Sequence, residues 1–270
     1  MNTIVIKLGG EVVQSEALAS IASDIAALHN RGQKVVLVHG GGPQATELQK
    51  QLGQTPKMIG GRRVTDQATL DVMKMTVAGK VNVDLCAALC AAGANPVGLH
   101  GASSLTIEAK RRPPKKVPGS DELVDYGLVG DVIAVNRKLI ELLLSANYTP
   151  VVACLGADRH GSLFNINADT IANQIAMAVD AEALVLVTDV PAVLRDVNNS
   201  ASRIAKMSIA EGTRAIAEGV VTRGMIPKLE ESFNAITAGV KSVLIVGRLA
   251  PGELLSAVEA PGSVGTLLVP

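Results

Sequence analysis

The sequence predicts an α/β fold: a three-layer αβα sandwich around a central, mainly parallel sheet. Strand-like and helix-like segments alternate along nearly all of the 270 residues, which is typical of parallel strands joined by crossover helices. Glycine-rich turns directly follow two successive predicted strands, as they do at the ligand-binding edge of such sheets. Hydrophobic residues make up 48% of the chain and charged residues 19%, so a large core can form.

The first half of the chain begins with a predicted strand in which β-branched residues dominate. Apolar residues at helical spacing predict the helices, Pro43 indicates a first helical turn, and glycines indicate where helices end. Asp66 is expected to cap a long helix, and Gly60-Gly61 to turn a hairpin. The predicted strands are 3–8, 34–39 and 95–101, the helices are 15–30, 44–52 and 66–92, and the hairpin is 57–65.

The second half starts from the least regular stretch, residues 102–130, where we expect one or two exposed hairpins. This stretch contains a basic run, Lys110 to Lys116, which Pro113-Pro114 interrupts. We interpret the run as an exposed hairpin tip, with contact to an acidic partner as the alternative. The predicted strands that follow are 149–155, 162–167, 182–188, 242–246 and 265–269, and the helices are 137–147, 168–179, 209–218, 226–238 and 253–258.

Composition excludes several classes of function. Lysine plus arginine equals aspartate plus glutamate at 25 each, so the chain lacks the basic excess of proteins that bind nucleic acid or anionic membranes. Only 1% of residues are aromatic, which argues against base stacking on single strands. The sequence has no apolar run of the roughly 18 residues that a membrane helix needs. Three cysteines without a CxxC motif indicate a reducing compartment, and we expect a cytoplasmic protein.

The two glycine-rich turns read KLGG, from Lys7 to Gly10, and HGGGP, from His39 to Pro43. Bare backbone amides at these turns, with a lysine at the end of the first strand, suit an anionic ligand at one edge of the sheet. The sequence lacks the P-loop pattern GxxxxGK[ST], a GxGxxG after a strand, and the protein-kinase motifs. The predicted phosphate site is therefore of another kind.

Six motifs, in this order, resemble the amino acid kinase family over essentially the whole chain, and with it a carbamate kinase-like fold. The motifs are KLGG (7–10), HGGGP (39–43), RVTD (63–66), NINAD (165–169), TDV (188–190) and GMIPK (224–228). The pattern is most similar to the members that act on N-acetyl-L-glutamate. The resemblance implies transfer of a phosphoryl group from ATP to the side-chain carboxylate, giving N-acetyl-L-glutamyl 5-phosphate in arginine biosynthesis. It implies ATP and Mg²⁺ as cofactors, with the metal held mainly by the nucleotide phosphates and by no dedicated protein site.

The resemblance also implies roles in phosphoryl transfer. Lys7 and Lys228 are similar to the two lysines that flank the transferring group, and Asp169 to the carboxylate that positions both lysines. Gly10 and Gly41 would donate backbone N–H groups to the phosphoryl group. Positioning and charge neutralisation are what such a transfer requires. The acceptor carboxylate, with a reference pKa of about 4.3, is already ionised, so no general base is needed and His39 is given no catalytic role.

The remaining implied roles concern the two substrates. Arg63 resembles a clamp for the α-carboxylate of the acyl substrate, a task that suits a bidentate guanidinium. The other acyl-substrate contacts implied are Gly41, Gly42, Asn165 and Asn167. The nucleotide contacts implied are Thr188, Asp189, Val190, Leu194, Val220, Val221 and Thr222. We expect a lobe for acyl binding and dimerisation at 1–176, fused through a shared sheet to a nucleotide lobe at 177–270.

Purely structural interpretations exist for the same residues. Lys7 alone would be read as a surface lysine before an ordinary turn, and Lys228 as a solvated helix lysine. Asp169 could serve only as a carboxylate at a helix N-terminus, and Asn165 and Asn167 as turn formers.

One departure from the family's pattern is Arg62, where an apolar residue is usual. It brings a second guanidinium near the acyl pocket, as in related kinases whose glutamate or aminoadipate is attached to an acidic carrier protein. That substrate class is the main alternative; a catalytically silent metabolite sensor and a dinucleotide oxidoreductase are the others. By resemblance we also expect a homodimer built around the helix 66–92 and insensitive to arginine, because an N-terminal helix of the inhibited hexamers is not seen before the first strand.

Overall fold

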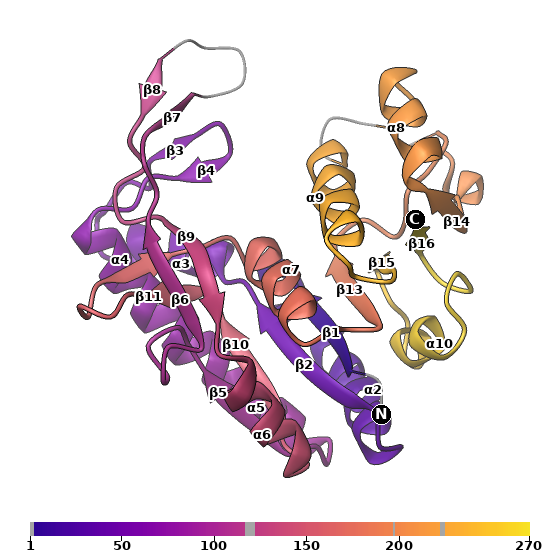
Figure 1. The fold of residues 1–270 in the computed structure, drawn as a ribbon, viewed down its shortest axis with the longest axis horizontal. Helices are drawn as coiled ribbons and strands as arrows, with labels where there is room; N and C mark the ends of the chain where they lie inside the picture. Colours follow the sequence, from indigo (N-terminus) through magenta and orange to yellow (C-terminus); the bar gives the residue numbers. More distant parts are fainter. Residues whose placement is uncertain (1–2, 117–121, 197, 222–224) are drawn as a thin grey trace.

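The computed structural model describes residues 3–116, 122–196, 198–221 and 225–270. Its centre is an eight-stranded sheet in the order β14-β16-β15-β13-β1-β2-β10-β5 (Figure 1). All neighbouring strands in it are parallel except β15 and β16. The strands are β1 (Thr3–Leu8), β2 (Lys34–His39), β5 (Pro96–Leu99), β10 (Thr149–Ala153), β13 (Ala183–Thr188), β14 (Lys206–Ser208), β15 (Val243–Gly247) and β16 (Thr266–Val269). The predicted mainly parallel sheet is confirmed.

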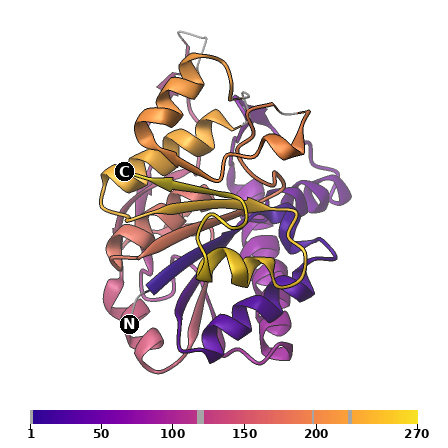
Figure 2. The same ribbon diagram turned by 90° about the vertical axis from the view of Figure 1, so that its right-hand side faces the viewer.

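Helices cover both faces of this sheet, as Figure 2 also shows. On one face α2, α5 and α10 pack over apolar side chains such as Ile6 and Leu37. On the other face α6, α7 and α9 cover side chains such as Val5 and Val36, because residues alternate between the two faces of a strand. The helices are α1 (Gly10–Val13), α2 (Leu18–Asn30), α3 (Gly42–Gln51), α4 (Gln67–Met73), η1 (Lys74–Val81), α5 (Asn82–Ala91), α6 (Arg137–Ser145), α7 (Ala168–Ala178), η2 (Ser200–Ser202), α8 (Ile209–Ala217), α9 (Ile226–Thr237) and α10 (Glu253–Glu259).

A second, four-stranded sheet in the order β12-β11-β6-β9 was not predicted. Its strand β9 (Gly130–Val135) is not among the predicted strands, since it is only partly buried and its hydrophobic alternation is weak. It pairs antiparallel with β6 (Ile107–Arg111), so the irregular stretch folds back on itself as one long hairpin. The other strands of this sheet are β11 (Leu155–Ala157) and β12 (Leu163–Asn165).

Two small hairpins rise from the same end of the molecule as α8 and α9 (Figure 1). The first joins β3 (Met58–Ile59) to β4 (Arg62–Arg63). Its two-residue turn is Gly60-Gly61, and both glycines have positive φ, as a tight hairpin requires. The second pairs β7 (Lys115–Lys116) with β8 (Leu123–Val124), and residues 117–121 lie outside the described structure. The hairpin predicted at 57–65 is confirmed.

The predicted long helix runs without a break from Gln67 to Ala91, through α4, η1 and α5. Asp66 caps it, since its carboxylate accepts a hydrogen bond from the Thr69 amide at 2.8 Å. Its middle part, η1, is a π-helix, which sequence periodicity did not predict. Within the described ranges no helix combines the length and the apolar character needed to cross a membrane.

Candidate active site

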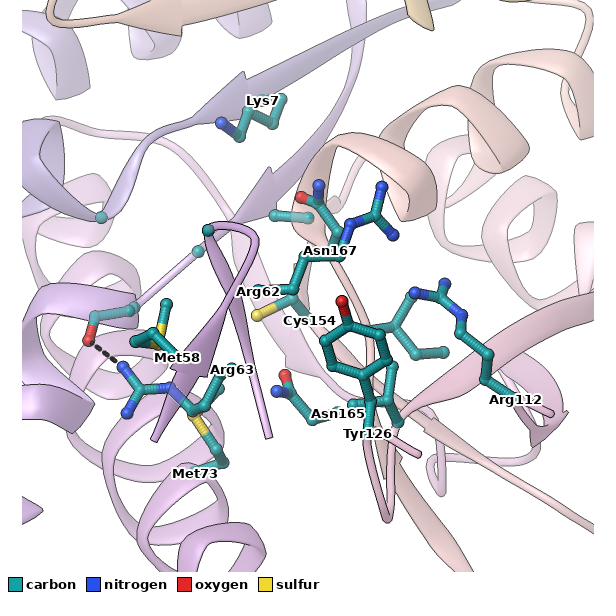
Figure 3. A pocket seen from close by; sticks show the side chains of 18 residues that line it. Lys7, Met58, Arg62, Arg63, Met73, Arg112, Tyr126, Cys154, Asn165 and Asn167 are labelled. Atoms are coloured by element: carbon teal, nitrogen blue, oxygen red, sulfur yellow. Dashed lines mark hydrogen bonds between the residues drawn. The ribbon is translucent and has the colours of Figure 1, made fainter. Parts of the chain in front are cut away.

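A cavity of about 300 Å³ opens at the carboxyl ends of β1 and β2, beside the N-terminus of α7 (Figure 3). Both glycine-rich turns contribute to it, together with the β3–β4 hairpin and the strand ends of the second sheet. Its volume is in the range of small-molecule sites. The lining residues are Lys7, Gly10, Gly40, Gly41, Gly42, Met58, Gly61, Arg62, Arg63, Met73, Arg112, Tyr126, Val129, Cys154, Asn165, Ile166, Asn167 and Ala168.

Lys7 and Asp169 form an ion pair at the upper end of this cavity. The Lys7 Nζ lies 2.7 Å from Asp169 Oδ1, and their side chains are only 10% and 18% exposed. Asp169 stands in the first turn of α7, where Asn167 caps the helix by accepting a hydrogen bond from the Asp169 amide at 3.0 Å. A pair so little exposed holds the ammonium group at a fixed place on the strand end. Asn167 is thus both a helix cap and part of the cavity wall.

Two glycines at the cavity have no room for a side chain. A Cβ on Gly10 would lie 2.8 Å from Pro43 Cδ, and one on Gly41 would lie 2.8 Å from Val77 Cγ2. Gly41 is also the N-cap of α3, so the free amides of that helix end point toward the cavity region. The close packing keeps backbone N–H groups, rather than side chains, at the surface that faces a ligand.

His39 fixes the second glycine-rich turn without taking part in the cavity. Its Nδ1 donates to the Gly40 carbonyl at 2.9 Å, and its Nε2 accepts from Asn82 Nδ2, also at 2.9 Å. Burial lowers the pKa of His39 to about 4, against the hydrogen bond to Gly40, which raises it. The imidazole is therefore neutral at pH 7 and is held by local hydrogen bonds.

Arg63 extends from β4 toward α3, where it donates to the Gly42 carbonyl at 3.0 Å and to Thr46 Oγ1 at 2.6 Å. It also donates to Gln49 Oε1. All three partners are neutral, and burial lowers the pKa of Arg63. A partly buried guanidinium held by neutral groups retains its charge for an anion in the cavity. Asn165, on the same cavity wall, donates to Thr65 Oγ1 at 3.1 Å.

Arg112 and Tyr126 line the cavity but were missed. Arg112 belongs to the basic run that was read as an exposed hairpin tip; for this residue that interpretation is wrong, because it is 8% exposed and its Nε lies 2.8 Å from Asp131 Oδ1. A bulge between Glu108 and Ala109 changes the alternation of β6, and nothing in the local sequence marks that change. The other described members of the run, Lys110, Arg111, Lys115 and Lys116, are exposed as expected.

Lys228 lies in the first turn of α9, in the other half of the chain. It is not among the residues that line the cavity around Lys7. Its charge and that of Lys7 both nevertheless act on Glu231, one helical turn further along α9, and lower the pKa of that carboxyl against the larger effect of burial. Glu231 was not predicted as a site residue, and the meeting of Lys7 and Lys228 at one phosphoryl group stays a prediction.

The predicted nucleotide residues lie in the C-terminal half of the chain, and none of the described ones lines the first cavity. Thr188 ends β13 and donates to Asp189 Oδ1 at 2.8 Å, which is the main reason that the pKa of Asp189 is lowered; Lys228 lowers it further. Val190 and Leu194 are partly buried, and Val221 is buried. Val220 lines a separate cavity of about 260 Å³ beside α8. Thr222 lies outside the described residues.

Comparison with known proteins gives a consistent result. A model described as the amino acid kinase family matches residues 2–247. The chain is 59% identical to an acetylglutamate kinase of Sorangium cellulosum, over 99% of this chain and 94% of that protein. It is 55% identical to an acetylglutamate kinase of Anaeromyxobacter sp. (strain K), over 100% and 99% of the two chains.

Solved structures share the fold. The protein smu.665 of Streptococcus mutans superposes with a TM-score of 0.77 at 30% identity, covering 99% of this chain and 98% of that one. A carbamate kinase of Giardia lamblia bound to AMP-PNP gives a TM-score of 0.70 at 20% identity, covering 99% and 98%. An N-acetylglutamate synthase of Neisseria gonorrhoeae in complex with coenzyme A and N-acetylglutamate gives 0.81 at 24%, covering 100% of this chain and 59% of that one.

Proposed function

The chain belongs to the amino acid kinase family, and from that premise we propose that it is an ATP-dependent kinase of N-acetyl-L-glutamate. The product is N-acetyl-L-glutamyl 5-phosphate, formed in arginine biosynthesis. The observation that carries the proposal is the little-exposed ion pair of Lys7 and Asp169 beside the glycine-rich turns of the cavity. The names of relatives at 54–59% identity support this choice of acyl substrate.

The acyl substrate occupies the cavity at β1 and β2 in this proposal. Arg63 binds the α-carboxylate, since its guanidinium has only neutral partners among the described residues. Asn165 and the amides of Gly41 and Gly42 hold the acetylamino group. The side-chain carboxylate then points toward Lys7, the cation at the other end of the same cavity.

Phosphoryl transfer needs little covalent chemistry from the protein. An oxygen of the side-chain carboxylate forms a bond to the γ-phosphorus of ATP, the bond to the β,γ-bridging oxygen breaks, and ADP leaves with that electron pair. No proton moves at the acceptor, because a carboxylate is already ionised. Lys7, Lys228 and the Gly10 amide stabilise the negative charge on the transferring group, and Asp169 keeps Lys7 in place.

The nucleotide is assigned to the lobe formed by residues 177–270, and acyl binding and dimerisation to residues 1–176. Thr188, Asp189, Val190, Leu194 and Val220 to Thr222 would contact the base and ribose. A Mg²⁺ ion would be held mainly by the nucleotide phosphates. When bound, that ion would offset phosphate charge.

The proposal extends to assembly and location. A homodimer formed through the long helix is supported by its exposed apolar residues Met75 and Val83, which are 54% and 62% exposed. Sedimentation of wild-type and Met75→Glu protein tests it, because an interfacial charge shifts a dimer toward monomer. A cytoplasmic location is supported by three cysteines that are all free thiols.

The experiment that tests the function is an assay of acyl phosphate formation from ATP and free N-acetyl-L-glutamate, trapped as a hydroxamate. We expect turnover that depends on both substrates and no NAD binding. Absence of turnover at millimolar N-acetyl-L-glutamate would overturn the proposed substrate. Absence of any hydroxamate with a set of carboxylic amino acids would overturn the proposed reaction.

A further inference from the structure

Arg112 is a buried cation in the acyl cavity to which the proposed reaction assigns no task. It directly follows β6, its side chain is only 8% exposed, and it lines the cavity that also contains Lys7. Its backbone amide donates to the Val129 carbonyl at 2.8 Å, which fixes the residue beside the start of β9. A guanidinium is costly to bury without partners, so its contacts show what holds it there.

Asp131 on β9 holds the guanidinium in place. Arg112 Nε donates to Asp131 Oδ1 at 2.8 Å, and Nη2 donates to the Gly130 carbonyl at 3.4 Å. Both partners belong to the strand that pairs with β6, so the contact is built into the long hairpin. Arg112 lines the cavity and Asp131 does not. The ion pair therefore presents its cationic member to the cavity.

The charged side chains that line this cavity are all cationic. Among the described residues of the lining they are Lys7, Arg62, Arg63 and Arg112, and the same lining contains no aspartate or glutamate. A carboxylate or a carbonyl oxygen thus meets hydrogen-bond donors in this cavity. An ammonium group meets like charge, and no carboxylate of the described lining balances it. The cavity therefore favours a ligand without an ammonium group.

The acyl group is the feature that distinguishes N-acetyl-L-glutamate from the free amino acid. At the α-carbon L-glutamate carries an ammonium group, whereas N-acetyl-L-glutamate carries a neutral amide whose carbonyl oxygen accepts hydrogen bonds. The proposed function assigns the α-carboxylate to Arg63 and the side-chain carboxylate to Lys7. Figure 3 shows Arg63 and Arg112 on opposite sides of the cavity, with Asn165 between them. Because Arg62 is exposed, Arg112 is the buried cation left for the third polar end of the substrate, the acetyl carbonyl.

We propose that Arg112 is a specificity-determining residue, which donates a hydrogen bond to the carbonyl oxygen of the N-acetyl group and repels the ammonium group of free L-glutamate. Asp131 is the positioning residue that orients its guanidinium. This inference rests on the proposed function and adds to the contacts assigned there to Asn165 and the glycine amides. One side chain thereby binds the acylated substrate and rejects the unacylated one.

Kinetics with two substrates test Arg112 in the full-length chain. The hydroxamate assay gives kcat/KM for N-acetyl-L-glutamate and for L-glutamate, and the ratio of the two measures discrimination. Arg112→Leu removes both the charge-assisted hydrogen bond and the repulsion. We expect the KM for N-acetyl-L-glutamate to rise about 30-fold at nearly unchanged kcat, and the ratio to fall about 100-fold. Arg111→Leu is the matched control and should match wild type, because Arg111 is exposed and pairs with Asp125 outside the cavity lining.

Two further variants separate charge from geometry and keep the test valid if Arg112→Leu does not fold. Arg112→Lys keeps the charge but loses the forked donor group, so kcat/KM for N-acetyl-L-glutamate should fall about 5-fold while the ratio stays within about 5-fold of wild type. Asp131→Asn keeps the guanidinium but weakens the contact that orients it. The KM for N-acetyl-L-glutamate should then rise about 3- to 10-fold without a change in kcat.

Two kinetic results would overturn the inference. One is an equal loss for both substrates in Arg112→Leu, which leaves the ratio unchanged and is what a merely structural role of Arg112 gives. The other is a ratio that falls as far in Arg112→Lys as in Arg112→Leu, which would show that the charge of Arg112 does not reject the ammonium group.

A binding measurement distinguishes this inference from the proposed function. In isothermal titration calorimetry without ATP, we expect the Kd of N-acetyl-L-glutamate to rise about 30-fold from wild type to Arg112→Leu, and the Kd of L-glutamate to stay equal or to fall. Equal rises for both ligands would overturn the inference even in an active enzyme. A wild-type chain that binds N-acetyl-L-glutamate but forms no hydroxamate would overturn only the proposed function.

Discussion

The two halves of the site differ in how far they are built before any substrate binds. In the N-terminal half Lys7 and Arg63 line one cavity, where Lys7 is paired with Asp169 and Arg63 is held by three neutral partners. His39, outside the cavity, fixes the second glycine-rich turn. In the C-terminal half Lys228 lowers the pKa of Asp189 through its charge, and neither side chain forms an ion pair among the described residues. On the proposed assignment, contacts within the protein hold the acyl side, whereas Lys228 on the nucleotide side has no ion pair among the described residues.

The largest expected effect is on the less organised side. Lys228→Ala removes a cation that is assigned only to the transition state, so we expect kcat to fall by roughly 100- to 1,000-fold, as for other lost transition-state contacts. The KM for N-acetyl-L-glutamate should change little. Steady-state kinetics with both substrates varied measure this, and Glu230→Gln serves as a control on the same helix. A raised acyl KM with normal kcat would contradict the assignment.

The next effect is the pH dependence of stability that buried His39 causes on the acyl side. Burial lowers the pKa of His39 from 6.5 to about 4. Between pH 6.5 and about pH 4 the imidazole is therefore protonated in the unfolded chain but neutral in the folded chain. Stability should therefore fall as the pH drops below about 6.5, by roughly 3 kcal/mol in total near pH 4. Denaturant unfolding of wild type and His39→Gln between pH 7 and 4.5 measures it. An identical pH dependence in both proteins would refute the explanation.

A smaller effect is expected at the acyl clamp. Arg63→Ala removes charge-assisted hydrogen bonds worth about 2 kcal/mol, so the KM for N-acetyl-L-glutamate should rise roughly 30-fold. The KM for ATP should stay near its original value. If Arg63→Ala lowered kcat and Lys228→Ala raised the KM for N-acetyl-L-glutamate, the roles assigned to the two residues would be wrong.

The smallest effect refines the nucleotide side. Thr188→Val removes the hydrogen bond to Asp189, which should raise the pKa of that carboxyl. The KM for ATP should rise by about 3- to 10-fold. The acyl KM should not respond. Titration of ATP at saturating N-acetyl-L-glutamate measures this, and an unchanged ATP KM would remove Asp189 from the proposed nucleotide contacts.

Local sequence signals account for most of the fold, whereas the acyl-substrate residues were predicted from the resemblance to the amino acid kinase family. Buried strands such as 183–188, and the cap at Asp66, have strong local signals, and the structure contains both. The weakly alternating strand β9 and the π-helix η1 have no such signal and were missed. Arg112 and Glu231 were missed for another reason: their environments are created by elements distant in sequence, Asp131 for the first and helix α7 for the second.

The central claim is that Lys7 and Lys228, from opposite ends of the chain, meet at one phosphoryl group. A crystal structure with N-acetyl-L-glutamate and a non-hydrolysable ATP analogue bound tests it most directly. The account predicts both ammonium nitrogens at hydrogen-bonding distance, about 3 Å, from oxygens of the γ-phosphoryl mimic. A γ-phosphoryl mimic bound with either lysine directed elsewhere would contradict it.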